Sequence, residues 1–334
     1  MGLAQTGTGK TAAFVLPILQ RLLNGPRGRL RALILSPTRE LAEQTHTVIV
    51  ALGRQTGLRS LTIYGGVSAL PQINGLRAGA EIAVACPGRL LDLMEQRAVN
   101  LKNIEVLVLD EADRMFDMGF LPSVRRILAS LPVPRQTLLF SATMPADVRK
   151  LTNDFLRHPV VIELDASRPV ETVSHAMYPV EQTQKVELLL AILRKSGSGQ
   201  VLIFTRTKHR AKKLSSQLIQ AGLPATSLQG NLSQNKRQEA MNLFRSGKAK
   251  ILVATDIAAR GIDVTQISHV INFDMPDTAD AYTHRIGRTG RMARLGTALS
   301  LATQEDLPMV RTIERLLGRT MERRKLAEPA RISG

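Results

Sequence analysis

Ala4-Gln5-Thr6-Gly7-Thr8-Gly9-Lys10-Thr11 is a glycine-rich stretch close to the first residue of the chain. Glycines in such a loop let successive backbone N–H groups approach a phosphate, and a following helix directs its positive N-terminus at the same anion. Gly7 and Gly9 suit that approach, Lys10 would reach the outer phosphates, and the Thr11 hydroxyl would bind magnesium. The general pattern opens with glycine, where this chain has Ala4, so a glycine-rich turn before a helix is the alternative interpretation.

Apolar runs typical of β-strands alternate with helix-like stretches along the chain. In the first part, strands are predicted at 31–35, 60–64, 82–85, 106–109, 137–140 and 160–164, and helices include 41–52 and 124–131. In the second part, strands are predicted at 201–204, 225–228, 251–254, 270–273 and 298–302, with helices near 185–193, 208–221 and 236–244. This alternation is typical of βαβ units around a parallel sheet, so the sequence predicts an α/β fold.

Two such domains are expected in tandem, with a cleft between them. Asp165-Ala166-Ser167-Arg168-Pro169 interrupts the alternation with small, polar and proline residues, which is typical of a linker. We expect a first domain over 1–164, a linker over 165–169, a second domain over 170–325 and a flexible tail over 326–334. A length of 334 residues and an apolar fraction of 44% allow each domain its own core.

Charge and cysteine content restrict the partner and the compartment. The 45 Lys and Arg residues exceed the 28 Asp and Glu residues by 17, which favours a polyanionic partner, with nucleic acid first. Aromatic residues make up 3% with no Trp, so contacts to backbone phosphates are expected rather than rows of stacked bases. The single cysteine, Cys86, excludes an internal disulfide and a cysteine-rich zinc site. We expect a soluble, cytoplasmic protein without membrane association.

An acidic cluster ends one of the predicted strands. The apolar run 104–109 leads into Asp110-Glu111-Ala112-Asp113, and ligands of open parallel sheets gather at strand carboxyl ends. Asp110 is placed to hold magnesium, and Glu111 to orient and deprotonate the water that attacks a γ-phosphate. Alone, this cluster is equally well a polar turn. Together with the glycine-rich loop it favours nucleotide hydrolysis.

Eight ordered motifs in this chain resemble those of the DEAD-box RNA helicases. They are AQTGTGKT at 4–11, PTRELA at 37–42, Gly65-Gly66, PGR at 87–89, DEAD at 110–113, SAT at 141–143, ATDIAARGID at 254–263 and HRIGRTGR at 284–291. The flanking stretches LDEADRMFDMGF and RQTLLFSATMP resemble the compact bacterial RhlE-like subgroup. The resemblance implies two tandem RecA-like domains with the active site in the interdomain cleft, ATP and Mg²⁺ as ligands, and RNA as a largely sequence-independent partner of a monomer.

The resemblance also assigns roles to particular residues. The catalytic residues would be Lys10, Glu111, Arg288 and Arg291, with Thr11 and Asp110 at the metal. ATP would be bound by Ala4, Gln5, Thr6, Gly7, Thr8, Gly9, Lys10, Thr11, Asp263, Arg288 and Arg291, with Asp263 at the ribose. RNA would be bound by Pro37, Thr38, Arg39, Gly66, Pro87, Gly88, Arg89, Gly230, Thr255, Arg260 and Gly261. The residues coupling the domains would be Asp113, Ser141, Thr143, Gln234, Arg237 and His284.

Two of these motifs have simpler interpretations when taken alone. Thr38 is then an ordinary helix N-cap with Arg39 in solvent. Ser141-Ala142-Thr143 is then a hydroxyl-capped turn. The ordered set of motifs favours the functional interpretation of both.

Arginines recur every third residue at Arg285, Arg288 and Arg291. Taken alone, arginines at this spacing indicate a basic stripe of side chains in solvent. Gly287 and Gly290 weaken helix propensity between them, and a purely solubilising stripe gives no reason for that. The resemblance makes Arg288 and Arg291 fingers that contact the γ-phosphate.

The chain departs from the family pattern in three places. Cys86 replaces the usual threonine before the PGR turn, and Gln229 replaces a usual histidine before Gly230. The strand and the adenine-recognising glutamine motif that precede the loop in the family are not present, because Met1-Gly2-Leu3 is too short for a full strand. We expect the first sheet to lose a central member, its core to be exposed and ATP binding to be weakened.

Three readings remain open. In the first, the chain is an N-terminally truncated ATP-dependent RNA helicase, in which ATP and RNA favour the same closed arrangement and short duplexes are separated locally. In the second, it is an RNA-binding or annealing module with little or no ATPase activity. In the third, it is a DNA-directed relative, which the ordered motifs disfavour.

Overall fold

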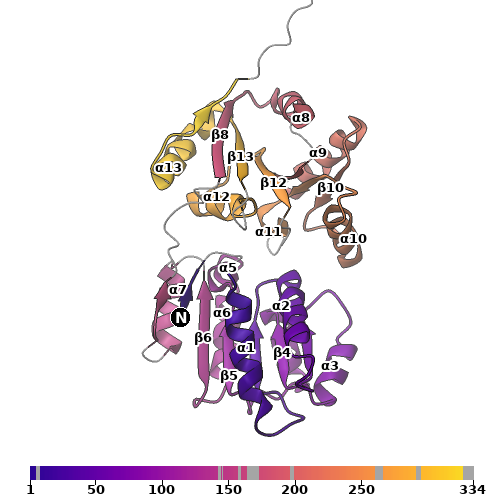
Figure 1. Ribbon diagram of the computed structural model, residues 1–334, viewed down its shortest axis with the longest axis vertical. Coiled ribbons are helices and arrows are strands. Elements are labelled where there is room, and N and C mark those ends of the chain that lie inside the picture. The colour runs from indigo at the N-terminus through magenta and orange to yellow at the C-terminus, as the bar shows by residue number, and fades with distance from the viewer. Residues whose placement is uncertain are drawn as a thin grey trace, which may run out of the picture. The chain divides into compact units, whose positions relative to one another are not determined.

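The computed structural model describes residues 1–4, 8–141, 144, 146–156, 159–163, 173–195, 199–259, 266–290 and 295–325. The chain divides into two compact units, Met1–Ala166 and Ser167–Gly334, each an α/β unit with its own sheet (Figure 1). The expected linker 165–169 and tail 326–334 lie outside the described residues, so the domain boundaries remain predictions.

The first unit contains a seven-stranded parallel sheet in the order β3-β4-β2-β5-β6-β1-β7. Its strands are β1 Gly2–Leu3, β2 Ala32–Leu35, β3 Ser60–Ile63, β4 Ile82–Ala85, β5 Val106–Leu109, β6 Gln136–Ser141 and β7 Ile162–Glu163. Its helices are α1 Lys10–Leu23, α2 Arg39–Leu52, α3 Leu70–Arg77, α4 Pro87–Glu95, α5 Ala112–Asp117, α6 Leu121–Ala129 and α7 Ala146–Phe155. The strand predicted over 160–164 is short and exposed as β7.

Alternate residues of each strand send their side chains to opposite faces of this sheet. On β2, Leu33 and Leu35 pack into one core with α4, α5 and α6, whereas Ala32 and Ile34 pack into a second core with α1 and α2. Helices therefore cover both faces. This covering explains why the strands read as continuous apolar runs in the sequence.

The second unit contains a parallel sheet of the same strand order, position for position: β10-β11-β9-β12-β13-β8-β14. Its strands are β8 Val173–Pro179, β9 Gln200–Phe204, β10 Ala225–Leu228, β11 Ile251–Ala254, β12 Ile267–Asn272, β13 Gly296–Ala302 and β14 Glu322–Arg323. Its helices are α8 Lys185–Lys195, α9 Lys208–Gln220, α10 Gln234–Arg245, α11 Asp256–Ala259, α12 Ala279–Ile286 and α13 Leu307–Leu317, with a 3₁₀ turn at Gln304–Asp306. The sequence did not predict β8 or β14. In the described part of the chain, no helix is long and apolar enough to cross a membrane.

β1 is much shorter than its counterpart in the second unit. β8 runs for seven residues along β13, whereas β1 pairs with β6 through Gly2 and Leu3 alone. The same two residues also pair with β7, so β1 lies second from the sheet edge. The expectation that the sheet loses a central member is therefore wrong: the strand is not central, and two of its residues are in register.

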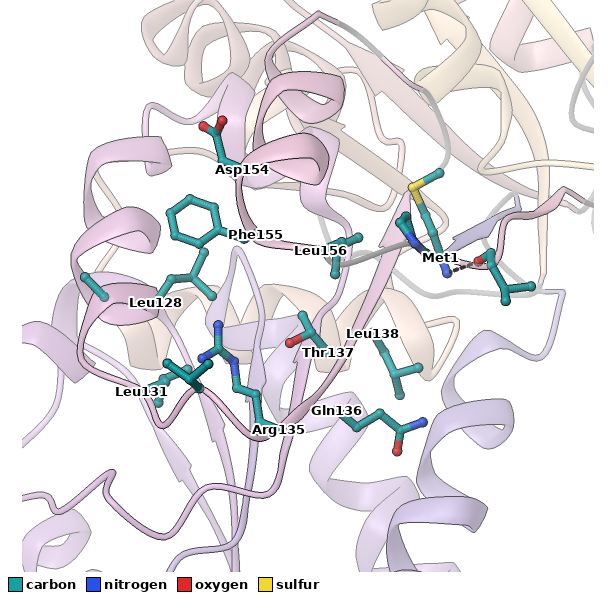
Figure 2. A pocket seen from close by; sticks show the side chains of 14 residues that line it. Met1, Leu128, Leu131, Arg135, Gln136, Thr137, Leu138, Asp154, Phe155 and Leu156 are labelled. Carbon is teal, nitrogen blue, oxygen red and sulfur yellow. Dashed lines mark hydrogen bonds between the residues drawn. The ribbon is translucent and has the colours of Figure 1, made fainter.

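A cavity of about 590 Å³ lies beside the part of β6 that β1 does not reach (Figure 2). Its lining combines apolar side chains, such as Leu128 and Phe155, with polar ones, such as Arg135 and Asp154. Met1 lines the cavity too, and its amino group donates a hydrogen bond to the Val160 carbonyl at 2.6 Å. Leu128 and Leu131 at this cavity are buried, as are Leu3 and Ala4, so the expected exposure of the first core is not found at these residues.

Candidate active site

Residues expected at ATP and a residue expected to couple the domains stand at the ends of three neighbouring strands of the first sheet. Ala4 comes after β1, Asp110 comes after β5, and Ser141 ends β6. Because β5, β6 and β1 are adjacent and parallel, these residues share the edge formed by the strand carboxyl ends. The backbone N–H of Ala4 donates to the Ser141 carbonyl at 3.0 Å, which ties the start of the glycine-rich loop to this edge.

Lys10, the first residue of α1, lies at the same edge. Its Nζ donates to the Ala4 carbonyl at 2.5 Å. Burial lowers the pKa of Lys10, and the nearby charges of Asp110 and Glu111 act in the opposite direction. Burial, and then the charge of Glu111, raises the pKa of Asp110. The structure thus brings together the lysine and the two carboxylates that the sequence assigned to one site.

The end of the glycine-rich loop forms the N-terminus of α1. Gly9 is the N-cap and has a φ of +89°, which glycine adopts without steric cost. A Cβ at Gly9 would meet no described atom within 4 Å. Glycine is therefore favoured at this position by the backbone conformation and not by lack of space. Thr8 and Gly9 are exposed, which leaves this helix end accessible to an anion. Gln5, Thr6 and Gly7 lie outside the described residues.

Glu111 is held in a left-handed backbone conformation, with φ +51° and ψ +53°. For a residue other than glycine this costs about 1–3 kcal/mol, and such strain is concentrated at functional sites. Its Oε2 pairs with Nη1 of Arg114 at 2.5 Å, and both residues are buried. Sequence reasoning missed Arg114, although its spacing of three residues from Glu111 is that of a helical ion pair.

Asp113 and Ser141 are joined by a hydrogen bond between their motifs. The backbone N–H of Asp113 donates to Oγ of Ser141 at 3.3 Å, and both residues are buried. The serine hydroxyl therefore contacts the acidic motif itself, beyond any capping of its own turn. Thr143, the other residue expected to couple the domains here, lies outside the described residues.

The donors expected at Mg²⁺ are one carboxylate and one hydroxyl. The described residues hold no group of three or more His, Cys, Asp or Glu side chains that could bind a metal ion by themselves. Mg²⁺ usually keeps several waters and binds one or two carboxylates together with phosphate oxygens. Asp110 at the strand end and Thr11 in the first turn of α1 fit a site of that kind.

The expected RNA-binding residues of the first unit follow the other three neighbouring strands. Pro37-Thr38-Arg39 comes after β2, Gly66 after β3 and Pro87-Gly88-Arg89 after β4, and β3, β4 and β2 are adjacent and parallel. Thr38 is the N-cap of α2, and its Oγ1 accepts from the Leu41 N–H at 3.3 Å. Gly66 has a φ of +79°. These residues share one sheet edge with the expected ATP site, because β2 pairs with β5.

Two arginines of this set, Arg39 and Arg89, each have a buried donor. In both, the Nη1 atom is buried and has no hydrogen-bond partner among the described residues. Arg39 lies 4.3 Å from the centre of the Tyr64 ring, so its placement in solvent, the simpler interpretation, is wrong. Arg89 donates through Nη2 to the Val67 carbonyl at 3.1 Å. Buried donors require acceptors, and a phosphate oxygen is a strong one for guanidinium.

In the second unit, two adjacent strands again end in expected RNA-binding residues. Gly230 follows β10 and Thr255 follows β11. Gln234 and Arg237 lie in the first turn of α10. Four further positions lie outside the described residues, and their roles remain predictions: Arg260, Gly261, Asp263 and Arg291.

Arg285 is a buried structural residue. Its Nε and Nη2 donate to the two carboxylate oxygens of Asp256 at 2.6 and 2.7 Å. Its Nη1 donates to Oδ1 of Asn272 at 3.0 Å and to the Asp274 carbonyl at 2.7 Å. A solvated basic stripe is therefore the wrong interpretation of Arg285, which instead joins α12 to α11 and to the end of β12.

Arg288 and His284 lie at the end of α12. His284 is in its last turn, and Arg288 follows Gly287, the C-cap. Arg288 is 4% exposed, so it too is not part of a solvated stripe. Their functional roles remain predictions.

Cys86 provides a test of packing behind the expected RNA edge. It is the N-cap of α4, and burial raises its pKa to about 12. Since the thiolate is the reactive form, on the order of 10⁻⁴ of the thiol would be ionised at pH 8. We expect negligible reaction with a thiol reagent at pH 8 in the folded chain and complete reaction in denaturant. Rapid labelling of the folded chain would contradict this placement of Cys86.

Comparisons with known proteins point to one family. The model of the DEAD/DEAH box helicase family matches residues 1–151, and that of the helicase conserved C-terminal domain matches 184–293. The RNA helicase CrhR of Synechocystis sp. is 44% identical over 321 residues, which cover 96% of this chain and 65% of CrhR. The DEAD-box ATP-dependent RNA helicase CshA of Bacillus subtilis is 39% identical, covering 97% of this chain and 66% of CshA. The chain thus spans just under two thirds of these relatives.

The structural comparison agrees with this result. A structure of S. cerevisiae Dbp5 bound to RNA and ADP BeF3 matches with a TM-score of 0.86 at 32% identity, covering 97% of this chain and 84% of that one. The two α/β units are RecA-like domains in tandem. The chain belongs to the DEAD-box RNA helicase family.

Proposed function

We propose that this chain is an RNA-dependent ATPase that binds the RNA backbone and separates short duplexes locally. The observation that carries the proposal is that residues expected at ATP and residues expected at RNA occupy two halves of the same sheet edge. Residues expected at ATP or its metal follow β5 and β1, and Ser141, expected to couple the domains, ends β6 between them. Residues expected at RNA follow β3, β4 and β2, and the two sets meet where β2 pairs with β5. RNA bound along one half would lie beside ATP bound along the other.

In the proposed reaction, Lys10 neutralises charge on the outer phosphates, and Glu111 accepts a proton from the attacking water. Thr11 and Asp110 would hold Mg²⁺, which when bound supplies positive charge at the β- and γ-phosphates. Arg288 and Arg291 of the second unit contribute positive charge at the γ-phosphate, and Asp263 would contact the ribose. Hydrolysis then requires both units.

RNA is proposed to be held by phosphate and sugar contacts. Arg39 and Arg89 support this proposal, because each has a buried donor without a partner in the described ranges. Phosphate and sugar contacts carry no sequence code, so binding would be largely sequence-independent, with RNA preferred through its 2′-hydroxyl groups. The second unit would add contacts from Gly230, Thr255, Arg260 and Gly261.

ATP and RNA are proposed to favour the same closed arrangement of the two domains. Each then raises the affinity for the other. The hydrogen bond from Asp113 to Ser141 gives the acidic motif a direct link to the end of β6. The remaining coupling residues of this proposal are Thr143, Gln234, Arg237 and His284.

The finer assignments rest on the sequence. We propose that the chain belongs to the RhlE-like subgroup, on the stretches LDEADRMFDMGF and RQTLLFSATMP. The single cysteine favours a reducing compartment, which supports a cytoplasmic location. A monomer is proposed, because both expected halves of the site are present in one chain.

RNA-stimulated hydrolysis tests the proposed function. With ATP and Mg²⁺, phosphate release should rise on addition of RNA, and a short RNA duplex should be separated in the same mixture. RNA binding without ATP hydrolysis would instead support an RNA-binding or annealing module. Equal stimulation by DNA of the same sequence would support a DNA-directed relative.

A further inference from the structure

The two expected RNA-binding loops that follow β2 and β3 are joined by a contact between Arg39 and Tyr64. Arg39 is the first residue of α2, and Tyr64 lies between β3 and Gly65-Gly66. The guanidinium carbon lies 4.3 Å from the ring centroid, which is the geometry of a cation–π contact. An aromatic side chain that no motif singled out therefore touches an arginine expected to bind RNA.

The Tyr64 ring is held at its hydroxyl end. Its hydroxyl donates to Oε1 of Glu43, which lies one turn after Arg39 on α2. Thr62 donates to the same oxygen at 3.3 Å. Burial, together with the bond to Glu43, raises the pKa of Tyr64, so the phenol stays protonated and continues to donate near neutral pH.

The backbone of Tyr64 is held as well. Its N–H donates to Oε1 of Gln72 at 3.2 Å, and its carbonyl accepts from Nε2 of the same side chain at 3.1 Å. Gln72 is buried, and its Nε2 also donates to the Ser68 carbonyl at 3.2 Å. The ring thus has a fixed backbone and a fixed hydroxyl, while its face is turned to Arg39.

A fixed ring changes what Arg39 can do. An arginine side chain has many rotamers, and ordering it on binding costs free energy that a preformed contact reduces. The cation–π attraction to the ring does not use the N–H donors of the guanidinium, so these can still bond to an acceptor. Nη1 of Arg39 is a buried donor with no partner in the described part of the chain.

We propose that Tyr64 is a positioning residue for RNA binding: its ring, anchored by Glu43, holds the Arg39 guanidinium so that its N–H edge meets a backbone phosphate. This proposal rests on the proposed function, which makes Arg39 an RNA contact. Tyr64 acts through Arg39 and needs no contact with RNA of its own.

A double-mutant cycle tests this role. Tyr64→Leu removes the ring and should weaken binding of a short single-stranded RNA by about 2- to 30-fold, the range of a cation–π contact. Tyr64→Phe keeps the ring and should retain most of the affinity. In the Arg39→Ala background, Tyr64→Leu should have no further effect. In ATP hydrolysis, Tyr64→Leu should raise the half-saturating RNA concentration and leave the maximal rate at saturating RNA unchanged.

The possible outcomes separate the two proposals. If Arg39→Ala leaves RNA affinity unchanged, the RNA edge of the proposed function is wrong. If Arg39→Ala weakens binding but Tyr64→Leu does not, or if their effects add in the double variant, the positioning role of Tyr64 is overturned. Thermal unfolding of each variant serves as the folding control. If Tyr64→Leu unfolds, Tyr64→Phe still tests the proposal, because it keeps the ring. A loss of RNA affinity in Tyr64→Phe as large as that in Arg39→Ala would contradict the role of the ring.

Discussion

Replacing Glu111 with glutamine is expected to lower RNA-stimulated ATP hydrolysis by about 10²- to 10⁴-fold, the contribution of a general base. Glutamine has nearly the same shape but cannot accept a proton from the attacking water. ATP-dependent binding of RNA should persist, because Lys10 and the RNA edge are unchanged. Phosphate release and RNA affinity, measured on the same protein, check both parts of this prediction.

Glu95→Gln is a matched control for this change. Glu95 is the last residue of α4, pairs with Arg126 at the surface and is assigned to neither ATP nor RNA, so its loss should leave turnover unchanged. Glu111→Gln also removes the charge that pairs with buried Arg114, and thermal unfolding separates that structural cost from catalysis. Unchanged turnover in a folded Glu111→Gln variant would exclude Glu111 as the base.

Replacing Arg288 with alanine is expected to lower the rate of ATP hydrolysis at saturating RNA by about 10³- to 10⁵-fold, the range of an arginine finger. The physical reason is the charge that develops on the γ-phosphate during transfer. Arg288→Lys keeps a positive charge but loses the planar fork, so only part of the activity should return. Single-turnover measurements with saturating ATP and RNA isolate this step from binding.

Arg245→Ala is the control for loss of an arginine in the second unit. Arg245 is exposed at the end of α10, and its removal should not change the rate. Arg288 is buried, so circular dichroism must first show that its variants are folded. A folded Arg288→Ala protein with the hydrolysis rate of the parent would remove the second unit's arginine from the reaction.

The strands that carry the site could be predicted because helices cover both faces of each sheet. Runs such as Val106–Leu109 and Ile251–Ala254 are apolar at every position, which is the pattern of buried parallel strands. Once their order is known, the motifs that follow them must share the carboxyl edge. The two-residue strands β1 and β14 are too short to show any pattern, and pairing with longer neighbours determines them.

The partners of individual side chains were harder to predict, because a charged group is buried only where folding places hydrogen-bonding groups from other elements beside it. In the sequence, Arg285 is one of three evenly spaced arginines. In the structure it is a buried residue that donates hydrogen bonds to Asp256 and Asn272. The left-handed conformation of Glu111 has no sequence signal, since such positions are normally glycine. Tyr64 was missed for the same reason as Arg285: its partners lie on another element.

The most direct test of coupling between the ATP and RNA sites is the affinity for a short single-stranded RNA, measured with Mg²⁺ in the presence and absence of a non-hydrolysable ATP analogue. If both ligands favour one closed arrangement, the analogue should tighten RNA binding by about 5- to 150-fold, the usual range of such coupling. Arg288→Ala should reduce this gain, because the positive charge proposed to act at the γ-phosphate from the second unit is lost. Equal RNA affinity with and without the analogue would contradict a shared, split site.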